Sequence, residues 1–166
     1  CPETGATCTI KENFTNLDRI VSTEVVDNQK MCISHISDRF TSYNSDIVNG
    51  ILARKPKPFP LVTFTVTTCK RYDLFKTTIN SFLNCCQDID KIDRWILVDD
   101  NSSEEDRKYM KINYPFFEII LKDKTDKGHP RSMNIILENV NSPYLFHMED
   151  DWKFFEKRRY ITECIN

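Results

Sequence analysis

Residues 61–68 read LVTFTVTT, an uninterrupted run of β-branched, aromatic and aliphatic side chains. Such a run is typical of a strand that is buried on both faces, because these side chains fit a pleated surface covered by other elements. Similar runs occur at RWILV (94–98), FFEIIL (116–121) and PYLFHM (143–148). The sequence therefore predicts four strands.

A segment of helical character follows each of the first three predicted strands. Apolar residues recur at helical spacing in DLFKTTINSFLNCC (73–86), with Asp73 as its predicted cap. Residues 99–115 lead through a serine cap into a polar helix, and residues 130–140 predict a helix with Pro130 in its first turn. This alternation predicts an α/β, Rossmann-like fold, with a mostly parallel sheet and helices on both faces.

The first 59 residues carry weaker signals. NFTNLDRIVSTEVV (13–26) predicts the start of a helix, whereas the three prolines of KPKPFP (55–60) end any helix and favour extended backbone. We interpret residues 1–59 as an N-terminal extension packed on the main domain, and residues 60–166 as that domain.

Composition limits the classes of partner. A chain of 166 residues suits one domain with a core, and 40% hydrophobic and 11% aromatic residues exclude a disordered chain. The formal net charge of -2 gives no general attraction to nucleic acid or anionic lipid, so phosphate binding must be local. No apolar stretch approaches the roughly 18 residues of a membrane span.

Seven cysteines occur at irregular spacing, and the adjacent Cys85 and Cys86 form no CxxC motif. This pattern favours reduced thiols and a cytoplasmic location over the Golgi lumen. The three histidines, His35, His129 and His147, are too scattered to predict a metal cluster.

Polar or charged residues follow all four predicted strands. They are Thr67, Thr68, Lys70 and Arg71 after the first, Asp99 and Asp100 after the second, Lys122, Lys124, Lys127, Gly128 and Arg131 after the third, and Glu149, Asp150 and Asp151 after the fourth. Because ligands of open α/β sheets bind at the carboxyl ends of the strands, we expect these residues to converge there.

The three adjacent carboxylates after the fourth strand repel one another and require positive charge nearby. A sugar nucleotide with a divalent cation fits this mixture of residues, because carboxylates suit the base and ribose, whereas diphosphate suits cations. Mg²⁺ and Mn²⁺ bind through one or two carboxylates together with phosphate oxygens. We therefore expect a metal–diphosphate unit beside the carboxylates; the alternative is a solvated strand end.

In this order, the motifs resemble those of the GT-A glycosyltransferases, in a form similar to family 2. VTFTVTTCKRYD (62–73) resembles their first strand and its Thr-x-x-Arg pattern, and ILVDDNSSEE (96–105) their second strand end. GHPRSMN (128–134) is similar to their Gly-x5-Asn helix start, and LFHMEDDW (145–152) to their DXD motif in a Glu-Asp-Asp form. The resemblance covers about residues 60 to 157.

The resemblance implies a role for each matching residue. Asp151 would be the metal ligand, and Glu149 and Asp150 would support the site or touch the donor sugar. Asp99 and Asp100 would contact the nucleoside. The remaining residues implied near the donor are Thr68, Arg71, Gly128, Arg131 and Asn134, with Arg131 replacing an arginine that the family often has at the position of Met133.

The implied activity is metal-dependent transfer of a sugar from a nucleoside-diphosphate sugar, with Mn²⁺ or Mg²⁺ and a UDP-sugar favoured, to an unidentified glycan, protein or lipid acceptor. The chain ends soon after the DXD-like motif, so we expect the donor-binding half of an enzyme, with an edge that favours self-association. The general base is not identified. The alternative is a fragment that binds nucleotide or a partner without transferring sugar.

The abundance of Lys, Asn and Ile resembles glycosyltransferases of giant DNA viruses of amoebae, which would place the protein in the host cytoplasm. Receiver domains also carry acidic residues at strand ends, but their acidic pair follows the first strand rather than the second. A nucleotidyltransferase would need a glycine-rich phosphate loop, and the loop after the first strand has no glycine.

Overall fold

The computed structural model of the chain describes residues 40–165. It contains a four-stranded sheet in the order β3-β2-β1-β4, in which every pairing is parallel. The strands are β1 (Val62–Thr68), β2 (Arg94–Asp99), β3 (Glu118–Leu121) and β4 (Tyr144–Glu149). All four predicted strands are confirmed, and the α/β fold class with them.

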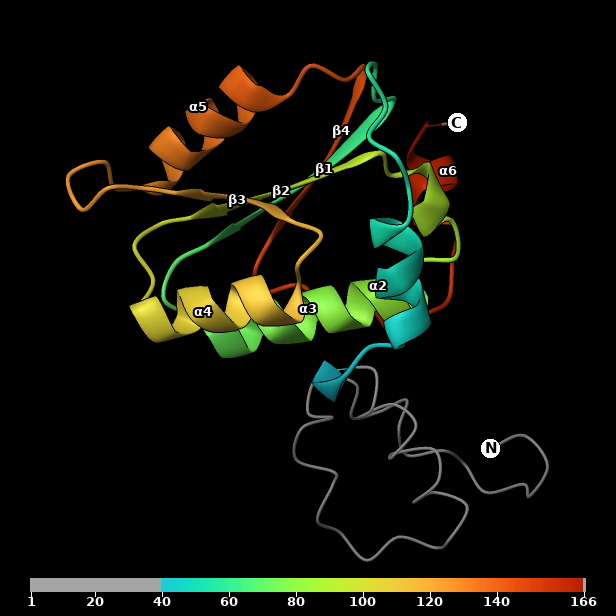
Figure 1. Cartoon of the computed structure of the whole chain (residues 1–166), viewed down its shortest axis with the longest axis horizontal. Helices are drawn as coiled ribbons and strands as arrows, with labels where there is room; N and C mark the ends of the chain where they lie inside the picture. Colours follow the sequence, from blue (N-terminus) through green and yellow to red (C-terminus); the bar gives the residue numbers. More distant parts are fainter. Residues whose placement is uncertain (1–39, 166) are drawn as a thin grey trace, which may run out of the picture.

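Helices cover both faces of the sheet, as predicted. Figure 1 shows α5 (His129–Asn139) on one face and α3 (Tyr72–Cys85) and α4 (Glu104–Asn113) on the other. Two shorter helices, α2 (Ser45–Leu52) and α6 (Tyr160–Ile165), lie toward the end where the strands begin. A 3-10 turn, η3 (Ile89–Lys91), precedes β2.

The main core lies between the sheet and α3. Phe64 of β1 is fully buried, and its ring centroid lies 5.0 Å from that of Phe82 and 4.6 Å from that of Trp95. A smaller cluster on the other face joins Ile96 and Val98 of β2 to α5. Because β1 is buried along its whole length, it shows the continuous apolar and β-branched pattern of a central parallel strand.

Two of the helix starts follow the predictions, and one does not. Ser103 caps α4 by accepting a hydrogen bond of 3.0 Å from the backbone N–H of Asp106, and α5 has a proline in its first turn. The prediction for Asp73 is wrong, because α3 begins at Tyr72 and its cap position is Arg71, two residues before Asp73 and without a side-chain hydrogen bond. Asp73 instead places a negative charge in the first turn, where it interacts favourably with the positive end of the helix dipole.

Residues 40–52, which precede β1, pack against the elements that follow them. Val48 and Ile51 of α2 belong to the main core, and the side-chain amide of Asn80 donates a hydrogen bond of 2.9 Å to the carbonyl of Phe40. The helix predicted over 13–26 lies outside the described residues. Among residues 40–165, no helix is long and apolar enough to cross a membrane.

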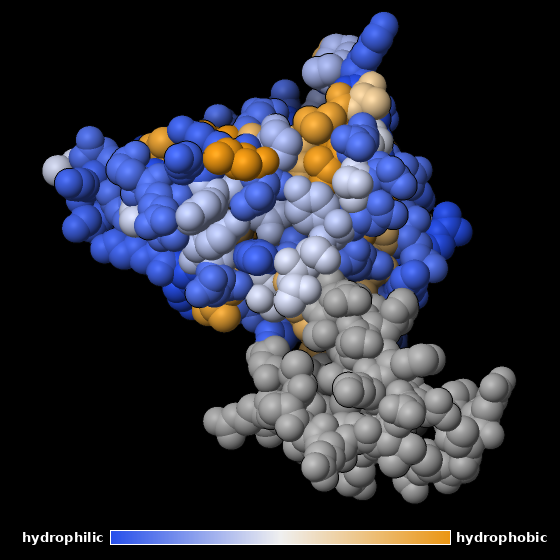
Figure 2. All heavy atoms as spheres, turned by 60° about the horizontal axis from the view of Figure 1, so that its bottom comes forward, coloured by the Kyte–Doolittle hydropathy of each residue, from blue (hydrophilic) through white to orange (hydrophobic). Residues whose placement is uncertain are grey.

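The outer surface of the α3 and α4 layer is polar. Figure 2 looks toward this side of the molecule and shows hydrophilic side chains with small, separate groups of apolar ones. On α4 the exposed apolar side chains include Tyr109 and Ile112. The helices therefore bury one apolar stripe against the sheet and present their other side to solvent.

Candidate functional site

Loops from all four strand ends meet at the carboxyl edge of the sheet, where backbone and side-chain hydrogen bonds join them. The N–H of Asp100 donates to the carbonyl of Thr68 at 2.8 Å, which joins the β2 loop to β1. The N–H of Lys70 donates to the hydroxyl of Ser102 at 2.8 Å. The N–H of Gly128 donates to the carboxylate of Asp100 at 2.8 Å, so the β3–α5 loop is joined as well.

Asp150 is the buried centre of the three adjacent carboxylates. Its side chain is fully buried and accepts a hydrogen bond of 2.7 Å from the hydroxyl of Thr68 and another from the guanidinium of Arg71. This contact links the end of β4 to the end of β1 and to the start of α3. Part of the positive charge that the carboxylates require therefore comes from Arg71 itself.

Asp151 and Glu149 point to solvent on either side of Asp150. Their side chains are 47% and 48% exposed, and Asp151 lies 3.7 Å from the guanidinium of Arg71. Glu149 lies 3.8 Å from the ring of His129 at the start of α5. The chain thus presents two accessible carboxylates on a turn that the buried Asp150 fixes.

Asp99 was predicted to contact the nucleoside. In the structure its side chain is buried, and it binds other residues of the protein. Its carboxylate accepts a hydrogen bond of 2.6 Å from Arg107 of α4 and two of 3.3 Å from the N–H of Ser102. Its side chain has no exposed surface. We therefore do not include Asp99 among the residues accessible to a ligand; its position fixes the loop that carries Asp100.

The carboxylate of Asp100 is also hydrogen-bonded to other residues of the protein. Its carboxylate accepts hydrogen bonds from the N–H of Gly128, from the amide of Asn101 at 2.9 Å and from the ammonium of Lys122 at 3.2 Å. Burial acts to raise the pKa of Asp100, but these three donors outweigh it and hold the pKa below its usual value. Asp100 keeps a small exposed fraction, 13%, at the rim.

Lys122 is a buried cation that organises the β3–α5 loop. Its ammonium donates to the carbonyl of Gly128 at 2.8 Å and to the hydroxyl of Ser132 at 3.0 Å, in addition to Asp100. Gly128 has a φ of 104°, a left-handed conformation that side-chain-bearing residues rarely adopt. Gly128 therefore occupies a backbone position that favours glycine, at the turn that starts α5.

The remaining predicted residues lie along α5. Arg131 forms ion pairs with Asp126 at 3.0 Å and with Glu138 at 3.1 Å, and these carboxylates raise its pKa. Asn134 is exposed on the same helix. The structure thus brings together Thr68, Arg71, Glu149, Asp150 and Asp151, with Asp100 and Gly128 beside them, whereas Arg131 is held by acidic residues of its own segment.

His147 lies on the α5 side of β4, next to this edge. One ring nitrogen lies 2.9 Å from the hydroxyl of Thr65, and the other is buried without a hydrogen-bond partner among residues 40–165. Burial lowers the pKa of His147 by disfavouring the charged ring, and the nearby carboxylate of Glu149 only partly opposes this. His147 is therefore a packed residue of the sheet.

The accessible donor set suits a metal that is shared with phosphate. Within residues 40–165, no group of three or more His, Cys, Asp or Glu side chains is arranged to hold a metal ion. Mg²⁺ and Mn²⁺ beside nucleotides need only one or two protein carboxylates. Asp151 and Glu149, two positions apart in the sequence, fit this mode because both are oxygen ligands that are open to solvent.

Arg107 and Lys122 form the ion pairs that connect the loops of the site. The sequence analysis predicted this role for neither residue. Arg107 stands in the second turn of α4 and pairs with Asp99 at 2.6 Å, a contact across eight positions. Lys122 was grouped with the residues expected to converge at the ligand site, because it follows a strand. A period of two along β3 would have identified it: Ile120 lies in the α5-side cluster, so Lys122 points to that covered face.

Comparisons with known proteins show a likeness at the level of structure and none at the level of sequence. No protein-family model matches the sequence, and no curated protein matches it. Among solved structures, the fold is similar to that of GalNAc-T7, a glycosyltransferase whose crystal structure contains UDP, GalNAc and Mn²⁺, with 11% identity and a TM-score of 0.45. The match covers 77% of this chain and 27% of that one. The fold class itself rests on the parallel sheet described above.

Proposed function

We propose that this chain is the donor-binding region of a metal-dependent glycosyltransferase. Its donor would be a nucleoside-diphosphate sugar, with a UDP-sugar favoured, and its acceptor a hydroxyl group of a glycan, protein or lipid. One observation carries the proposal: Asp150 is buried against Thr68 and Arg71, and this contact holds Asp151 and Glu149 in the open at the carboxyl edge.

The position of this carboxylate turn within the sheet supports the proposal. The chain moves from β1 to β2 and β3 on one side, and then returns to place β4 on the other side of β1. The order of strands thus reverses between β1 and β4, and in open α/β sheets ligands bind outside the carboxyl ends at such a point. Thr68 and Asp150 lie at this reversal.

Charge at the turn suits a diphosphate and a divalent cation together. Arg71 is 46% exposed and lies between Asp150 and Asp151, so one side of its guanidinium remains open to an anion. Lys124 and Lys127 are exposed on the β3–α5 loop at the same edge. The carboxyl edge therefore has cations that could bind phosphate oxygens. It also has carboxylates that could bind a metal.

In this proposal each side chain has a defined task. Asp151 would hold Mn²⁺ or Mg²⁺, with Glu149 as a second ligand or as a contact to the donor sugar. The bound cation would act as a Lewis acid and stabilise the charge that develops on the leaving diphosphate. Arg71 would bind a phosphate oxygen, and Asp150 would orient Arg71 without touching the donor.

Calorimetric titration of UDP into the protein tests the donor site. We expect binding with Mn²⁺, its loss in EDTA, and its loss in Asp151→Ala. Asp90→Ala is the matched control, because Asp90 is an exposed aspartate in η3, before the start of β2. Absence of binding to UDP, GDP and dTDP with either metal would overturn the proposal, as would equal loss of binding in both variants.

Turnover with UDP-sugars and a panel of acceptors separates the two forms of the proposal. Transfer that depends on Asp151 would assign the activity to this chain. Metal-dependent binding without transfer would assign it a nucleotide-binding role alone.

A further inference from the structure

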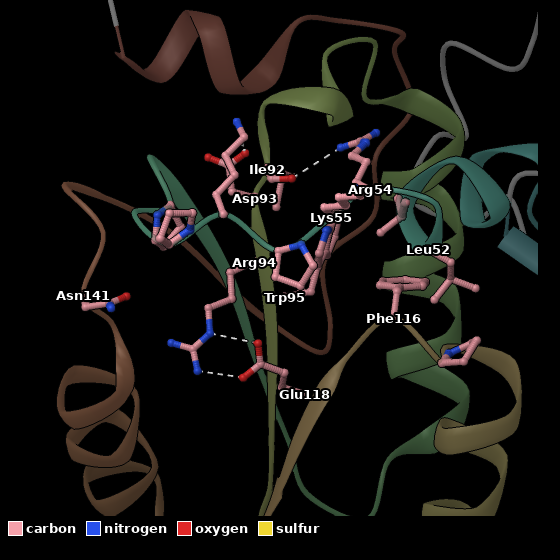
Figure 3. A pocket seen from close by; sticks show the side chains of 16 residues that line it. Leu52, Arg54, Lys55, Ile92, Asp93, Arg94, Trp95, Phe116, Glu118 and Asn141 are labelled. Carbon is pink, nitrogen blue, oxygen red and sulfur yellow. Dashed lines mark hydrogen bonds and ion pairs between the residues drawn. The ribbon is translucent and has the colours of Figure 1, made fainter.

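A pocket of about 490 Å³ lies at the opposite edge of the sheet from the carboxylate turn. Its walls come from the end of α2, the proline-rich segment after it, the first residues of β2 and the residues before β3 (Figure 3). This volume is within the range of small-molecule sites, about 300 to 1,000 Å³. The pocket shares no lining residue with the proposed donor site.

The apolar part of the wall is built from rings and branched side chains. Trp95 and Phe116 line the pocket, and their ring centroids lie 5.0 Å apart in an edge-to-face arrangement. Ile51 and Ile92 add buried aliphatic surface. The indole N–H of Trp95 is buried without a hydrogen-bond partner among residues 40–165, so the wall also contains an unused donor.

Two ion pairs neutralise most of the charge on the lining residues. Arg94 holds Glu118 through two hydrogen bonds of 2.9 and 2.7 Å, and Lys57 lies 2.6 Å from Asp93. These four side chains satisfy one another, and the bidentate geometry of the first pair fixes its position. They leave the wall with no net charge of their own.

Arg54 and Lys55 remain without a carboxylate partner among residues 40–165. One guanidinium nitrogen of Arg54 donates to the carbonyls of Ile89 and Ile92 at 3.2 and 3.4 Å, which orients the side chain and leaves its other nitrogens for a ligand. Figure 3 shows Arg54 and Lys55 close together, away from the Arg94–Glu118 pair. The pocket therefore carries two uncompensated positive charges.

The backbone beside these two cations is stiff. Pro56, Pro58 and Pro60 all line the pocket, and each proline ring fixes one φ angle. A wall whose conformation is already restricted loses less entropy when a ligand binds. The backbone that carries the two charges is thus restricted before any ligand arrives.

We propose that this pocket binds a small organic anion with an aromatic or branched apolar body and a single carboxylate or phosphate group. The body would lie against Trp95 and Phe116, and the anionic group would face Arg54 and Lys55. This site is independent of the proposed donor site, which lies at the other end of β2, so either proposal can fail without the other.

Nitrogen-15 NMR of the labelled protein tests the proposal with two natural reporters. The chain has two tryptophans, Trp95 in the pocket wall and Trp152 directly after the carboxylate turn. Trp152→Phe assigns both indole signals, since the signal that remains belongs to Trp95. The probes are phenylacetate and phenyl phosphate, with phenylacetamide as the neutral analogue of the carboxylate.

We expect phenylacetate or phenyl phosphate to shift the Trp95 signal saturably, with a dissociation constant on the order of 1 mM for ligands of this size. The Trp152 signal should not follow the same curve. Phenylacetamide should bind at least about fivefold more weakly, because it lacks the charge that Arg54 and Lys55 recognise. Which of the two anions binds more tightly identifies the preferred group.

A pair of double variants isolates the charges. Arg54→Gln with Lys55→Gln should weaken anion binding about fivefold and leave phenylacetamide unchanged. Lys108→Gln with Lys111→Gln makes the same change of charge on the outside of α4 and should leave both unchanged. No saturable shift of Trp95, equal binding of the neutral probe, or equal loss in the two double variants would each overturn the proposal. The comparison of charged and neutral probes on the unaltered protein does not depend on how any variant folds.

Discussion

The two ends of one parallel sheet treat charge in opposite ways. At the carboxyl edge, Asp99, Asp150 and Lys122 have buried side chains, and each is paired inside the protein. At the amino edge, the side chain of Lys57, which pairs with Asp93, is 60% exposed. The side chain of Glu118, which pairs with Arg94, is also more than half exposed. The carboxyl edge thus uses ionic contacts to fix its loops, whereas each ion pair at the amino edge has one partner that is more than half exposed.

This difference indicates which loops of the protein are held most firmly in position. A buried ion pair requires desolvation of both groups and is strongly disrupted when one partner is removed, whereas an exposed pair contributes little to stability. The loops that carry Asp151 and Arg71 are therefore held firmly. The pocket at the other edge relies on proline-restricted backbone and apolar packing.

The largest effect is expected from Lys122→Met, which keeps the volume but removes the buried cation. Asp100 would lose its ammonium partner, and the carbonyl of Gly128 and the hydroxyl of Ser132 would lose a donor. We expect the free energy of unfolding to fall by about 3 kcal/mol in urea titration. Lys127→Met, an exposed change in the same loop, should have little effect. Equal losses would show that the burial of Lys122 is not what matters.

A smaller loss of stability is expected from Asp150→Ala. The variant would remove a charge-assisted contact with Arg71 and leave the buried hydroxyl of Thr68 without its acceptor. We expect a loss of about 2 kcal/mol in the free energy of unfolding. Asp151→Ala removes the neighbouring carboxylate, which is exposed, and should leave stability nearly unchanged while abolishing metal-dependent UDP binding. A large loss of stability in Asp151→Ala would contradict the division of roles.

The pH dependence of stability should show the contribution of Asp100. Its folded-state pKa is lowered, so the stabilisation is complete above the unfolded pKa and is lost as the pH falls through the folded value. Asp100→Asn should cost about 1.5 kcal/mol at pH 7, and this difference from the unaltered protein should shrink below a pH of about 4. Urea titrations from pH 7 to acid provide the measurement. A difference that stays constant with pH would exclude a charge effect.

The smallest effect is expected at the amino edge. Lys57→Ala removes an exposed cation from Asp93, whose carboxylate keeps a hydrogen bond of 2.7 Å from the N–H of Leu61. We expect a loss of about 0.5 kcal/mol in the free energy of unfolding, and a smaller one in high salt, because exposed pairs are screened. If Lys57→Ala equals Lys122→Met, the contrast between the two edges does not hold.

The strands and their order of appearance could be predicted from the sequence because burial on both faces leaves a continuous pattern. Residues 62–68 are all buried, and they read as β-branched or aromatic side chains without a break. The start of β3 was less clear. Phe116 and Phe117 extend the apolar run but lie before the strand and pack against Trp95 instead.

The roles of individual acidic residues were harder to predict. Glu149, Asp150 and Asp151 look alike in the sequence, yet only the middle one is buried. The alternation along β4 contains the signal, because Met148 is buried and Asp150 lies two positions further along. The amino-edge pocket could not be predicted, since its walls come from four segments whose approach depends on the whole fold.

The pairing of β1 with both β2 and β4 also sets an order of assembly. Thr65 pairs with Ile96 on one side and, across 82 positions, with His147 on the other. On a chain made from its N-terminus, β1, β2 and β3 can associate before β4 has been synthesised, and contacts across long separations form slowly. The carboxylate turn is thus completed only after the other three strands have been made, and until then the open side of β1 is available for wrong pairing.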